Sequence, residues 1–130
     1  MKKIFLLLIM VALGFSQTIN FENSYETAIK KAKKENKPLM AVIVQTSCPW
    51  CKKFKEITLT DPKVIKKVNE NFIPLMLNKD HDEMPDDIRA RMVPTTYFLD
   101  SKGGELFSTI GYKRPAEFLE DMDEALGARE

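Results

Sequence analysis

The pattern of apolar and polar residues predicts an α/β fold with a central mixed four-stranded sheet flanked by helices on both faces. Residues 39–44 are continuously apolar, which is typical of a strand covered on both sides. Segments with helical periodicity separate this run from later apolar runs, and strands joined by such crossovers pair in parallel. The segment 101–104 contains two adjacent glycines between apolar runs and predicts a hairpin, which adds an antiparallel edge.

The first predicted element is a helix that begins at Asn23 and ends before Pro38. Asn23 can cap this helix, and Glu26 can reach back to the cap as in a capping box. The apolar residues fall on one face, while the lysines gather mostly on the other face and in the last turns, where the helix dipole favours cations. Residues 39–45 then form the central strand.

A second helix begins at Cys48 or Pro49, because a proline is tolerated in the first turn of a helix. Its periodicity turns Phe54 and Ile57 toward the core. Another helix spans residues 61–71, with an aspartate as its cap and a proline at its first position.

The second predicted strand covers residues 72–77, and Pro74 places part of it at an edge or in a bulge because proline has no N–H to donate. No internal repeat or low-complexity linker interrupts the chain. The remaining elements are, in order, a polar loop at 78–87, a short helix at 88–92, a strand at 93–100 entered through a proline, the hairpin turn at 101–104, its returning strand at 105–110, and a last helix from Pro115 to Gly127.

The length of 130 residues predicts one domain. With 44% hydrophobic and 30% charged residues, the composition is ordinary for a globular protein and permits a core without disulfide staples. The formal net charge of +1 gives no indication of a nucleic-acid partner. No segment has the pattern of a dimerisation element, so a monomer is expected.

The first residues of the chain have the pattern of a secretory signal. Two lysines form a positive n-region, residues 4–13 are uninterruptedly apolar, and the small residues Gly14 and Ser16 follow. We therefore expect residues 1–16 to be a signal peptide and residues 17–130 to be the folded domain. The apolar run is shorter than the roughly 20 residues that span a bilayer. A buried N-terminal strand, a short membrane anchor or an uncleaved signal are the alternatives.

Cys48 and Cys51 are the only cysteines of the chain, and they stand where the central strand is followed by a helix. The first turn of a helix offers unpaired N–H groups and a partial positive charge, which favour a thiolate. A thiolate there is a nucleophile near neutral pH, below the free-cysteine pKa of about 8.5. The pattern predicts dithiol–disulfide exchange, in which Cys48 attacks a disulfide and Cys51 resolves the mixed disulfide.

Two other interpretations of the cysteine pair stay open. A structural disulfide across so small a loop would remove little chain entropy and would stabilise weakly. A structural zinc site needs four ligands, and the chain offers two cysteines and one histidine, His81. Thiolates suit Cu(I), but His81 lies among acidic residues in a polar loop, which is typical of a solvated surface residue. No metal or organic cofactor is implied, because the two sulfurs carry both electrons.

Several residues near the cysteines are candidates for substrate contact or for tuning the thiolate. Trp50 forms either an exposed wall for a partner peptide or a partly buried ring over the sulfurs. Lys52 and Lys53 either add to the positive field at the attacking thiol or form an ordinary solvated helix face. Pro94 and Thr95 either present an edge to an extended substrate or form a plain turn into a strand.

The order of elements, the motif Cys48-Pro49-Trp50-Cys51 after a buried strand, and the later motif Val93-Pro94-Thr95 together resemble the thioredoxin-like family. The resemblance covers residues 21–127 and implies a thioredoxin-like fold. It also implies that the bond before Pro94 is cis and that this proline faces the cysteine pair. Thiol–disulfide exchange on proteins is the implied activity, and the implied substrate-contacting residues are Pro49, Trp50, Val93, Pro94 and Thr95.

The helix at 61–71 looks like that of the exported, single-domain branch of this family. The resemblance thus implies a periplasmic location, cysteine-containing exported proteins as substrates, and a membrane redox partner. Two features depart from cytoplasmic thioredoxins. Ser47 stands where those proteins carry a tryptophan before the first cysteine, and their buried strand aspartate falls near Val42, which is apolar here. Water or a substrate group would then assist deprotonation of Cys51.

The sequence is compatible with three functions. The first is a disulfide reductase recharged by a membrane electron donor. The second is an oxidase or isomerase that donates or shuffles disulfides, although the lack of a visible dimerisation element argues against a dimeric isomerase. The third is a binding module or metallochaperone that uses the same sulfurs as ligands. The direction of exchange depends on the relative stability of the thiolate and disulfide forms.

Overall fold

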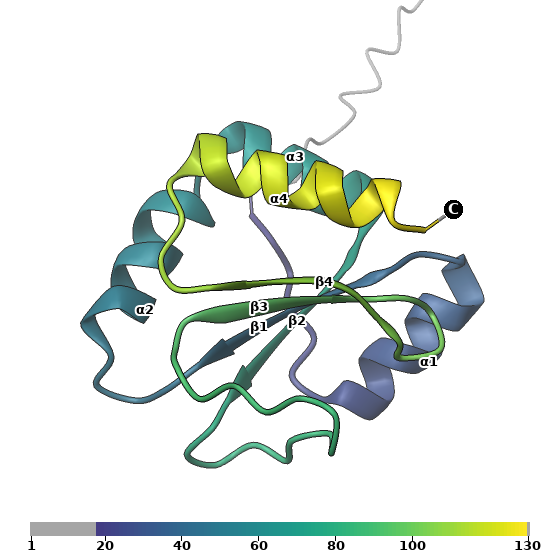
Figure 1. Cartoon of the computed structure of the whole chain (residues 1–130), viewed down its shortest axis with the longest axis horizontal. Helices are drawn as coiled ribbons and strands as arrows, with labels where there is room; N and C mark the ends of the chain where they lie inside the picture. The colour runs from purple at the N-terminus through teal and green to yellow at the C-terminus, as the bar shows by residue number, and fades with distance from the viewer. Residues whose placement is uncertain (1–17, 130) are drawn as a thin grey trace, which may run out of the picture.

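The computed structural model describes residues 18–129, so the predicted signal peptide lies outside the described residues. Figure 1 shows α3 and α4 over one face of the sheet, α1 against the other face and α2 at one end. The elements along the chain are α1 (Tyr25–Glu35), β1 (Leu39–Val44), α2 (Pro49–Lys53), the π-helix η1 (Phe54–Thr58), α3 (Pro62–Asn71), β2 (Ile73–Asn78), β3 (Thr95–Leu99), β4 (Glu105–Ile110) and α4 (Pro115–Gly127).

The four strands form one mixed sheet in the order β2-β1-β3-β4. β1 and β2 are parallel, while β3 runs antiparallel to both β1 and β4. β2 is an edge strand, in line with the Pro74 it contains. This architecture confirms the predicted α/β fold with a mixed four-stranded sheet and helices on both faces.

The central strand β1 is buried along its whole length. Met40, Val42 and Val44 belong to the core beneath α3 and α4, and the intervening residues belong to the core beneath α1. This alternation follows from the two-residue period of a strand, which points successive side chains to opposite faces. The expectation of a strand covered on both faces is confirmed, and its carboxyl end carries the turn with the cysteines.

The connection between β2 and β3 differs from the prediction in two ways. The expected short helix at 88–92 is absent, and β3 is therefore not reached by a parallel crossover. Parallel β1 and β2 end at the same edge of the sheet, and a loop without a crossover helix returns the chain at that edge. β3 must then start there and run the other way. Its first residue, Thr95, pairs with Ile43, which brings the start of β3 beside the cysteine turn.

The helix after the cysteines also differs from the prediction, because α2 widens into the π-helix η1. The N–H of Leu59 donates to the Phe54 carbonyl at 3.0 Å, an i to i+5 bond. This wider turn keeps Phe54 buried but brings Thr58 inward in place of Ile57, which is 46% exposed. The inward position predicted for Ile57 is therefore wrong.

The start of α1 is shifted by one residue from the prediction. Ser24 is the cap, and its Oγ accepts the Thr27 N–H at 3.2 Å, so the capping box of Asn23 and Glu26 is wrong. Ser24 suits this place because its short hydroxyl reaches the N–H three residues on. The cap expected for α3 is confirmed, since the Asp61 carboxylate accepts two N–H groups of the first turn.

Candidate active site

Cys48 and Cys51 are joined by a disulfide, with their Cα atoms 5.2 Å apart. Cys48 caps α2 and is partly exposed, whereas Cys51 lies inside the helix and is 2% exposed. Pro49 occupies the first helical position and is exposed. The arrangement leaves one sulfur open to a partner molecule and covers the other.

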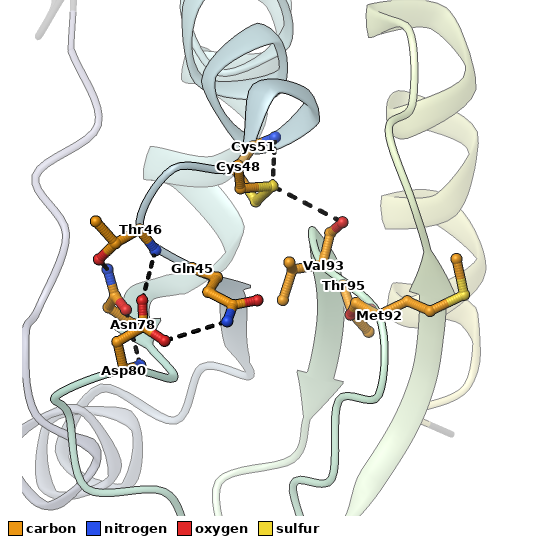
Figure 2. Close-up of a disulfide and its surroundings, with 9 residues drawn as sticks. All are labelled: Gln45, Thr46, Cys48, Cys51, Asn78, Asp80, Met92, Val93 and Thr95. Atoms are coloured by element: carbon orange, nitrogen blue, oxygen red, sulfur yellow. Dashed lines mark hydrogen bonds between the residues drawn. A yellow bond between two sulfur atoms is a disulfide. The ribbon is translucent and has the colours of Figure 1, made fainter.

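The sulfur of Cys48 lies between two backbone groups, as Figure 2 shows. It accepts the Cys51 N–H at 3.1 Å, and the Val93 carbonyl oxygen lies 4.0 Å away. A backbone N–H directed at sulfur stabilises negative charge there, which favours the thiolate in the reduced pair. The predicted strand-to-helix context of the cysteines is thus present in atomic detail.

The segment 93–95 lies against the cysteine turn, and the Val93–Pro94 peptide bond is cis. Pro94 and Thr95 are buried. The Thr95 hydroxyl donates to the Met92 carbonyl at 2.6 Å. Of the three predicted residues, Val93 therefore presents its carbonyl to the sulfur, while the Thr95 side chain is engaged within its own loop.

An aromatic patch flanks the disulfide. Trp50 is 56% exposed, and its ring centroid lies 5.8 Å from that of Tyr112. The backbone places Tyr112 here, because the preceding Gly111 has a φ of +90° and donates its N–H to the Pro94 carbonyl at 2.7 Å. Sequence reasoning missed Tyr112. An aromatic residue directly after a turn glycine was the available signal.

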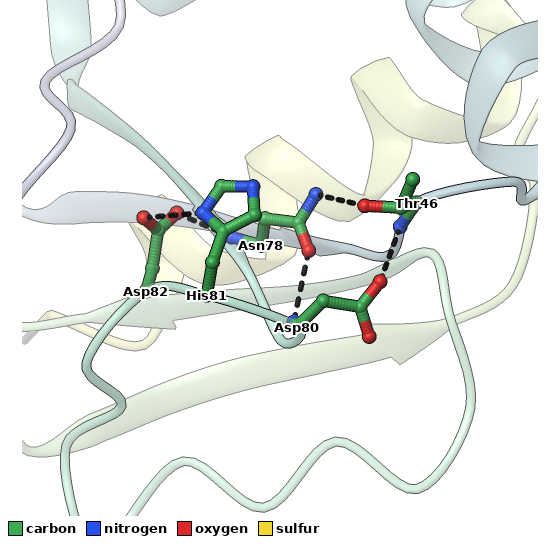
Figure 3. A network of polar contacts seen from close by, with 5 residues as sticks. All are labelled: Thr46, Asn78, Asp80, His81 and Asp82. Carbon is green, nitrogen blue, oxygen red and sulfur yellow. Dashed lines mark hydrogen bonds and ion pairs between the residues drawn. The ribbon is translucent and has the colours of Figure 1, made fainter.

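A polar network supports the other side of the cysteine turn (Figures 2 and 3). The Asp80 carboxylate accepts the Thr46 N–H at 3.0 Å and the side-chain amide of Gln45 at 3.2 Å. Asn78 donates from its amide to the Thr46 hydroxyl at 3.2 Å. The Thr46 N–H is the main cause that lowers the pKa of Asp80. These contacts join the ends of β1 and β2, and sequence reasoning missed both Asn78 and Asp80.

The network holds a strained stretch of backbone. Ser47, between Thr46 and Cys48, has a φ of +57°, in the left-handed region that non-glycine residues rarely adopt. An open cavity of about 670 Å³ lies beside this turn, lined in part by both cysteines, Lys52 and Lys55. The cavity gives a partner molecule access to the cysteine turn.

His81 takes no part in the surroundings of the sulfurs. Its ring is exposed, and Nδ1 lies 3.1 Å from the Asp82 carboxylate (Figure 3). This agrees with the expected solvated surface position. Among residues 18–129, no group of three or more His, Cys, Asp or Glu side chains is arranged to hold a metal ion.

The core behind Cys51 is apolar. Val42 is fully buried and lies opposite Met76 in the parallel register of β1 and β2. Neither side chain can accept a proton. In the part of the chain that the structure describes, no helix is long and apolar enough to cross a membrane.

Known proteins with similar sequences include two of different length. Anterior gradient protein 2 of Xenopus laevis is 31% identical over 119 residues, which cover 87% of this chain and 63% of that protein. Spermatogenesis-associated protein 20 of Mus musculus is 38% identical over 79 residues, which cover 61% of this chain but only 10% of that protein. The chain thus spans somewhat less than two thirds of anterior gradient protein 2 and a small part of spermatogenesis-associated protein 20.

Among solved structures, a thioredoxin from Thermus thermophilus superposes with a TM-score of 0.71 at 23% identity, covering 84% of this chain and 88% of that one. This likeness shows the fold. The family model described as "Thioredoxin-like domain" matches residues 25–126. Since this match takes in β1, the cysteine turn, the 93–95 segment and nearly all of α4, the chain belongs to the thioredoxin-like domain family.

Proposed function

We propose that this protein reduces disulfides in exported proteins, with Cys48 as the attacking thiol and Cys51 as the resolving thiol. The thioredoxin-like domain with its disulfide-forming pair makes the chain a thiol–disulfide oxidoreductase. The observation that supports the two roles is the difference in exposure. Cys48 is open to a partner and accepts an N–H bond at its sulfur, whereas Cys51 is 2% exposed.

The proposed reaction moves two electrons from the protein to its substrate. The Cys48 thiolate attacks one sulfur of a substrate disulfide, forms a mixed disulfide and releases the other substrate sulfur as a thiolate. Cys51 loses its proton and attacks Cys48, which closes the intramolecular disulfide and releases the second substrate thiolate. Because Val42 and Met76 offer no base behind Cys51, water or a substrate group takes that proton.

The substrate is an extended segment of another protein that lies across the disulfide. The Val93 carbonyl, next to the Cys48 sulfur, can accept a backbone N–H of such a segment, as in strand addition. Pro49 and Trp50 supply an exposed apolar wall beside it. Pro94 and Thr95 hold the loop through their buried positions rather than through exposed side chains.

The proposed periplasmic location of the protein is based on residues 1–16, whose positive and apolar regions support export. The exported domain would consist of residues 17–130. A membrane redox partner would then restore the reduced pair. Expression of the full chain in a Gram-negative cell, followed by fractionation and N-terminal sequencing, checks this. A periplasmic product that begins at Gln17 is expected, and a cytoplasmic product that retains Met1 would contradict export.

Two cysteine variants test the assigned roles. Cys48→Ser should lose reduction of insulin disulfides, because no thiol is left to attack. Cys51→Ser should accumulate mixed disulfides with partner proteins, because the resolving step is missing. A Cys51→Ser variant that captures nothing and keeps wild-type turnover would refute the roles. Metal that co-purifies with the wild type and is lost in Cys48→Ser would favour the metal-binding alternative.

The reduction potential of the Cys48–Cys51 couple decides the direction of exchange. A potential near −270 mV, about that of thioredoxin, is expected for a reductase that needs an electron donor. A potential near −120 mV, about that of a strong disulfide donor, would make the protein an oxidase instead. Equilibration against a series of dithiothreitol and glutathione buffers measures it.

A further inference from the structure

The side chain of Lys53 is held between two aromatic rings beside the disulfide. Its ammonium lies 5.0 Å from the ring centroid of Trp50 and 4.9 Å from that of Tyr112. Both distances are within the range in which a cation is attracted to the face of a ring. We refer to Lys53, Trp50 and Tyr112 as the aromatic clamp. The clamp limits the freedom of a side chain that would otherwise sample many rotamers in solvent.

The aromatic clamp is anchored to both sides of the active site. The ring of Tyr112 meets the buried Phe54 edge-on, with centroids 6.4 Å apart. On one flank, Gly111 bonds to the Pro94 carbonyl. On the other, the Thr58 hydroxyl of η1 donates to the Lys113 carbonyl at 2.5 Å. Hydrogen bonds thus hold the backbone on either side of Tyr112, and the ring that attracts the Lys53 ammonium has a defined position.

Lys53 keeps an unneutralised charge. Among residues 18–129, no carboxylate lies within ion-pair distance of Lys53. Its neighbour Lys52 has Glu56 at 4.0 Å, and Lys55 adds a further exposed cation to the same segment. The helical segment that presents the disulfide therefore carries an excess of positive charge next to an exposed tryptophan.

We propose that the aromatic clamp makes this enzyme select disulfides that have an aspartate or glutamate close to the target cysteine. This inference rests on the proposed function and names its substrate class. Trp50 offers apolar contact to the bound segment, and the pre-positioned ammonium pairs with a carboxylate at little further cost in side-chain entropy. Charge complementarity of this kind acts mainly on the rate of association.

Three synthetic peptide disulfides test the proposal. They share one sequence except for the residues that flank the cysteine, which are Glu in one, Gln in the second and Lys in the third. The second-order rate of reduction by the fully reduced wild-type protein is measured for each, and each rate is divided by the rate with dithiothreitol. This division removes the intrinsic reactivity of the peptide. Comparing peptides within one protein variant cancels any change in the thiolate fraction of Cys48.

The Glu peptide should react about tenfold faster than the Lys peptide at low ionic strength, with the Gln peptide between them. The ratio should shrink toward one in about 1 M salt, where the screening length is about 3 Å. Lys53→Gln should lower the ratio severalfold. Lys34→Gln is the matched control, because Lys34 is an exposed lysine in the last turn of α1, on a separate part of the molecule from α2 (Figure 1).

A Glu-to-Lys ratio of one in the wild type would overturn the proposal, as would equal ratios in Lys53→Gln and Lys34→Gln. Tyr112→Leu provides a second check that leaves all charges in place. It should lower the ratio because the ammonium is then held by one ring only. If the reduced wild type reduces none of the peptides faster than a free cysteine does, the proposed function itself fails, and the substrate preference fails with it.

Discussion

At the scale of single residues, the approach to the reactive sulfur is controlled by a carboxylate that is remote in sequence. Asp80 lies beyond the end of β2, yet it accepts the N–H of Thr46, two residues before Cys48. Ser47, which lies between Thr46 and Cys48, adopts a left-handed backbone conformation that is energetically costly for a residue with a side chain. The position of the Cys48 sulfur therefore depends on a contact that offsets this strain.

Asp80→Ala should slow disulfide exchange at Cys48. A misplacement of about 1 Å can cost about 100-fold in rate, and partial relaxation of the turn should cost about tenfold. The measurement is the pH-independent rate at which the reduced protein attacks a small neutral disulfide. Asp80→Asn should restore much of this rate, since its side-chain oxygen can still accept the Thr46 N–H.

Asp86→Ala is the control for this prediction. Asp86 belongs to the same loop, is exposed, and makes no side-chain hydrogen bond or ion pair within the described part of the chain. It should exchange disulfides at the wild-type rate. Equal limiting rates in Asp80→Ala and Asp86→Ala would show that Asp80 has no positioning role.

At the scale of elements, β3 and α4 are joined by packed aromatic rings. Phe98 of β3 is fully buried, with ring centroids 5.3 Å from Phe72 and 6.1 Å from Phe118. Phe118 in turn meets Phe54 of η1 edge-on at 5.1 Å. This chain of rings runs from the middle of the sheet to the helix that carries the cysteines. Packing on one face of the sheet thus supports the active-site helix.

Phe98→Ala should lower the free energy of unfolding by about 3–5 kcal/mol, because it removes a buried ring and leaves a cavity that its neighbours cannot fill. Urea unfolding of the oxidised protein measures the change. Phe98→Leu retains most of the apolar volume and should cost less. A loss below about 1 kcal/mol for Phe98→Ala would mean that the core collapses around the deletion.

The contact of α4 with β4 contains a carboxylate in an unfavourable place. The Oδ2 atom of Asp121 is buried and has no hydrogen-bond partner within the described residues. Burial raises the pKa of Asp121, although Lys113 and the hydroxyl of Thr109 act in the opposite direction. The charged form of this side chain is therefore less stable in the folded protein than in the unfolded chain.

Asp121→Asn should raise the free energy of unfolding at pH 7. A raised native pKa means that the folded protein holds this proton more tightly, so stability is lost as pH rises through the native pKa. The difference in the free energy of unfolding between Asp121→Asn and the wild type should vanish below about pH 3.9, where the aspartate is protonated in the folded and the unfolded protein. Urea unfolding at pH 7 and pH 3.5 measures this, with Glu124→Gln on the exposed side of α4 as the control. A variant less stable than wild type at pH 7 would contradict it.

At the scale of the whole molecule, the topology brings three distant segments to one edge of the sheet. The cysteine turn follows β1, the loop that contains Asp80 follows β2, and Val93 precedes β3. The parallel pairing of β1 with β2 and the antiparallel pairing of β1 with β3 place all three there. The same edge carries the acidic groups whose protonation should affect the stability of the molecule.

The stability of the wild type should fall steeply as pH is lowered below about 4. Hydrogen bonds from Thr46 and Asn78 N–H groups lower the pKa values of Asp80 and Asp82, respectively. A carboxyl with a lowered native pKa contributes stability above its unfolded pKa of about 3.9, and this stability is lost as pH falls through the native pKa. In the double variant Asp80→Asn, Asp82→Asn, the free energy of unfolding should depend less steeply on pH. Urea titrations from pH 2 to 6 measure this dependence. The same slope in both proteins would contradict the assignment.

Much of this organisation could be predicted from local sequence. The unbroken apolar run at 39–44 indicated a strand covered on both faces, and the proline at position 62 marked the start of α3. Where local signals compete, prediction was less secure. Asn23 and Ser24 can both cap a helix, and the structure shows that Ser24 is the cap of α1. The π turn of η1 accompanies the burial of Thr58, whose hydroxyl donates to the carbonyl of Lys113, a residue far along the chain.

Local sequence was sufficient to predict the class of fold and the reactive pair, because periodicity and a Cys-x-x-Cys after a buried strand are local properties. Tertiary structure alone decided the direction of β3 and the surroundings of the sulfurs. Asp80 and Tyr112 have no sequence pattern that links them to Cys48 or to Trp50, whereas Val93 belongs to a motif that the sequence already placed near the cysteines. The residues around the sulfurs become neighbours because hydrogen bonding in the sheet sets the direction and register of the strands. The loop between β2 and β3 contains no helix, so β3 starts at the same edge of the sheet at which β1 and β2 end.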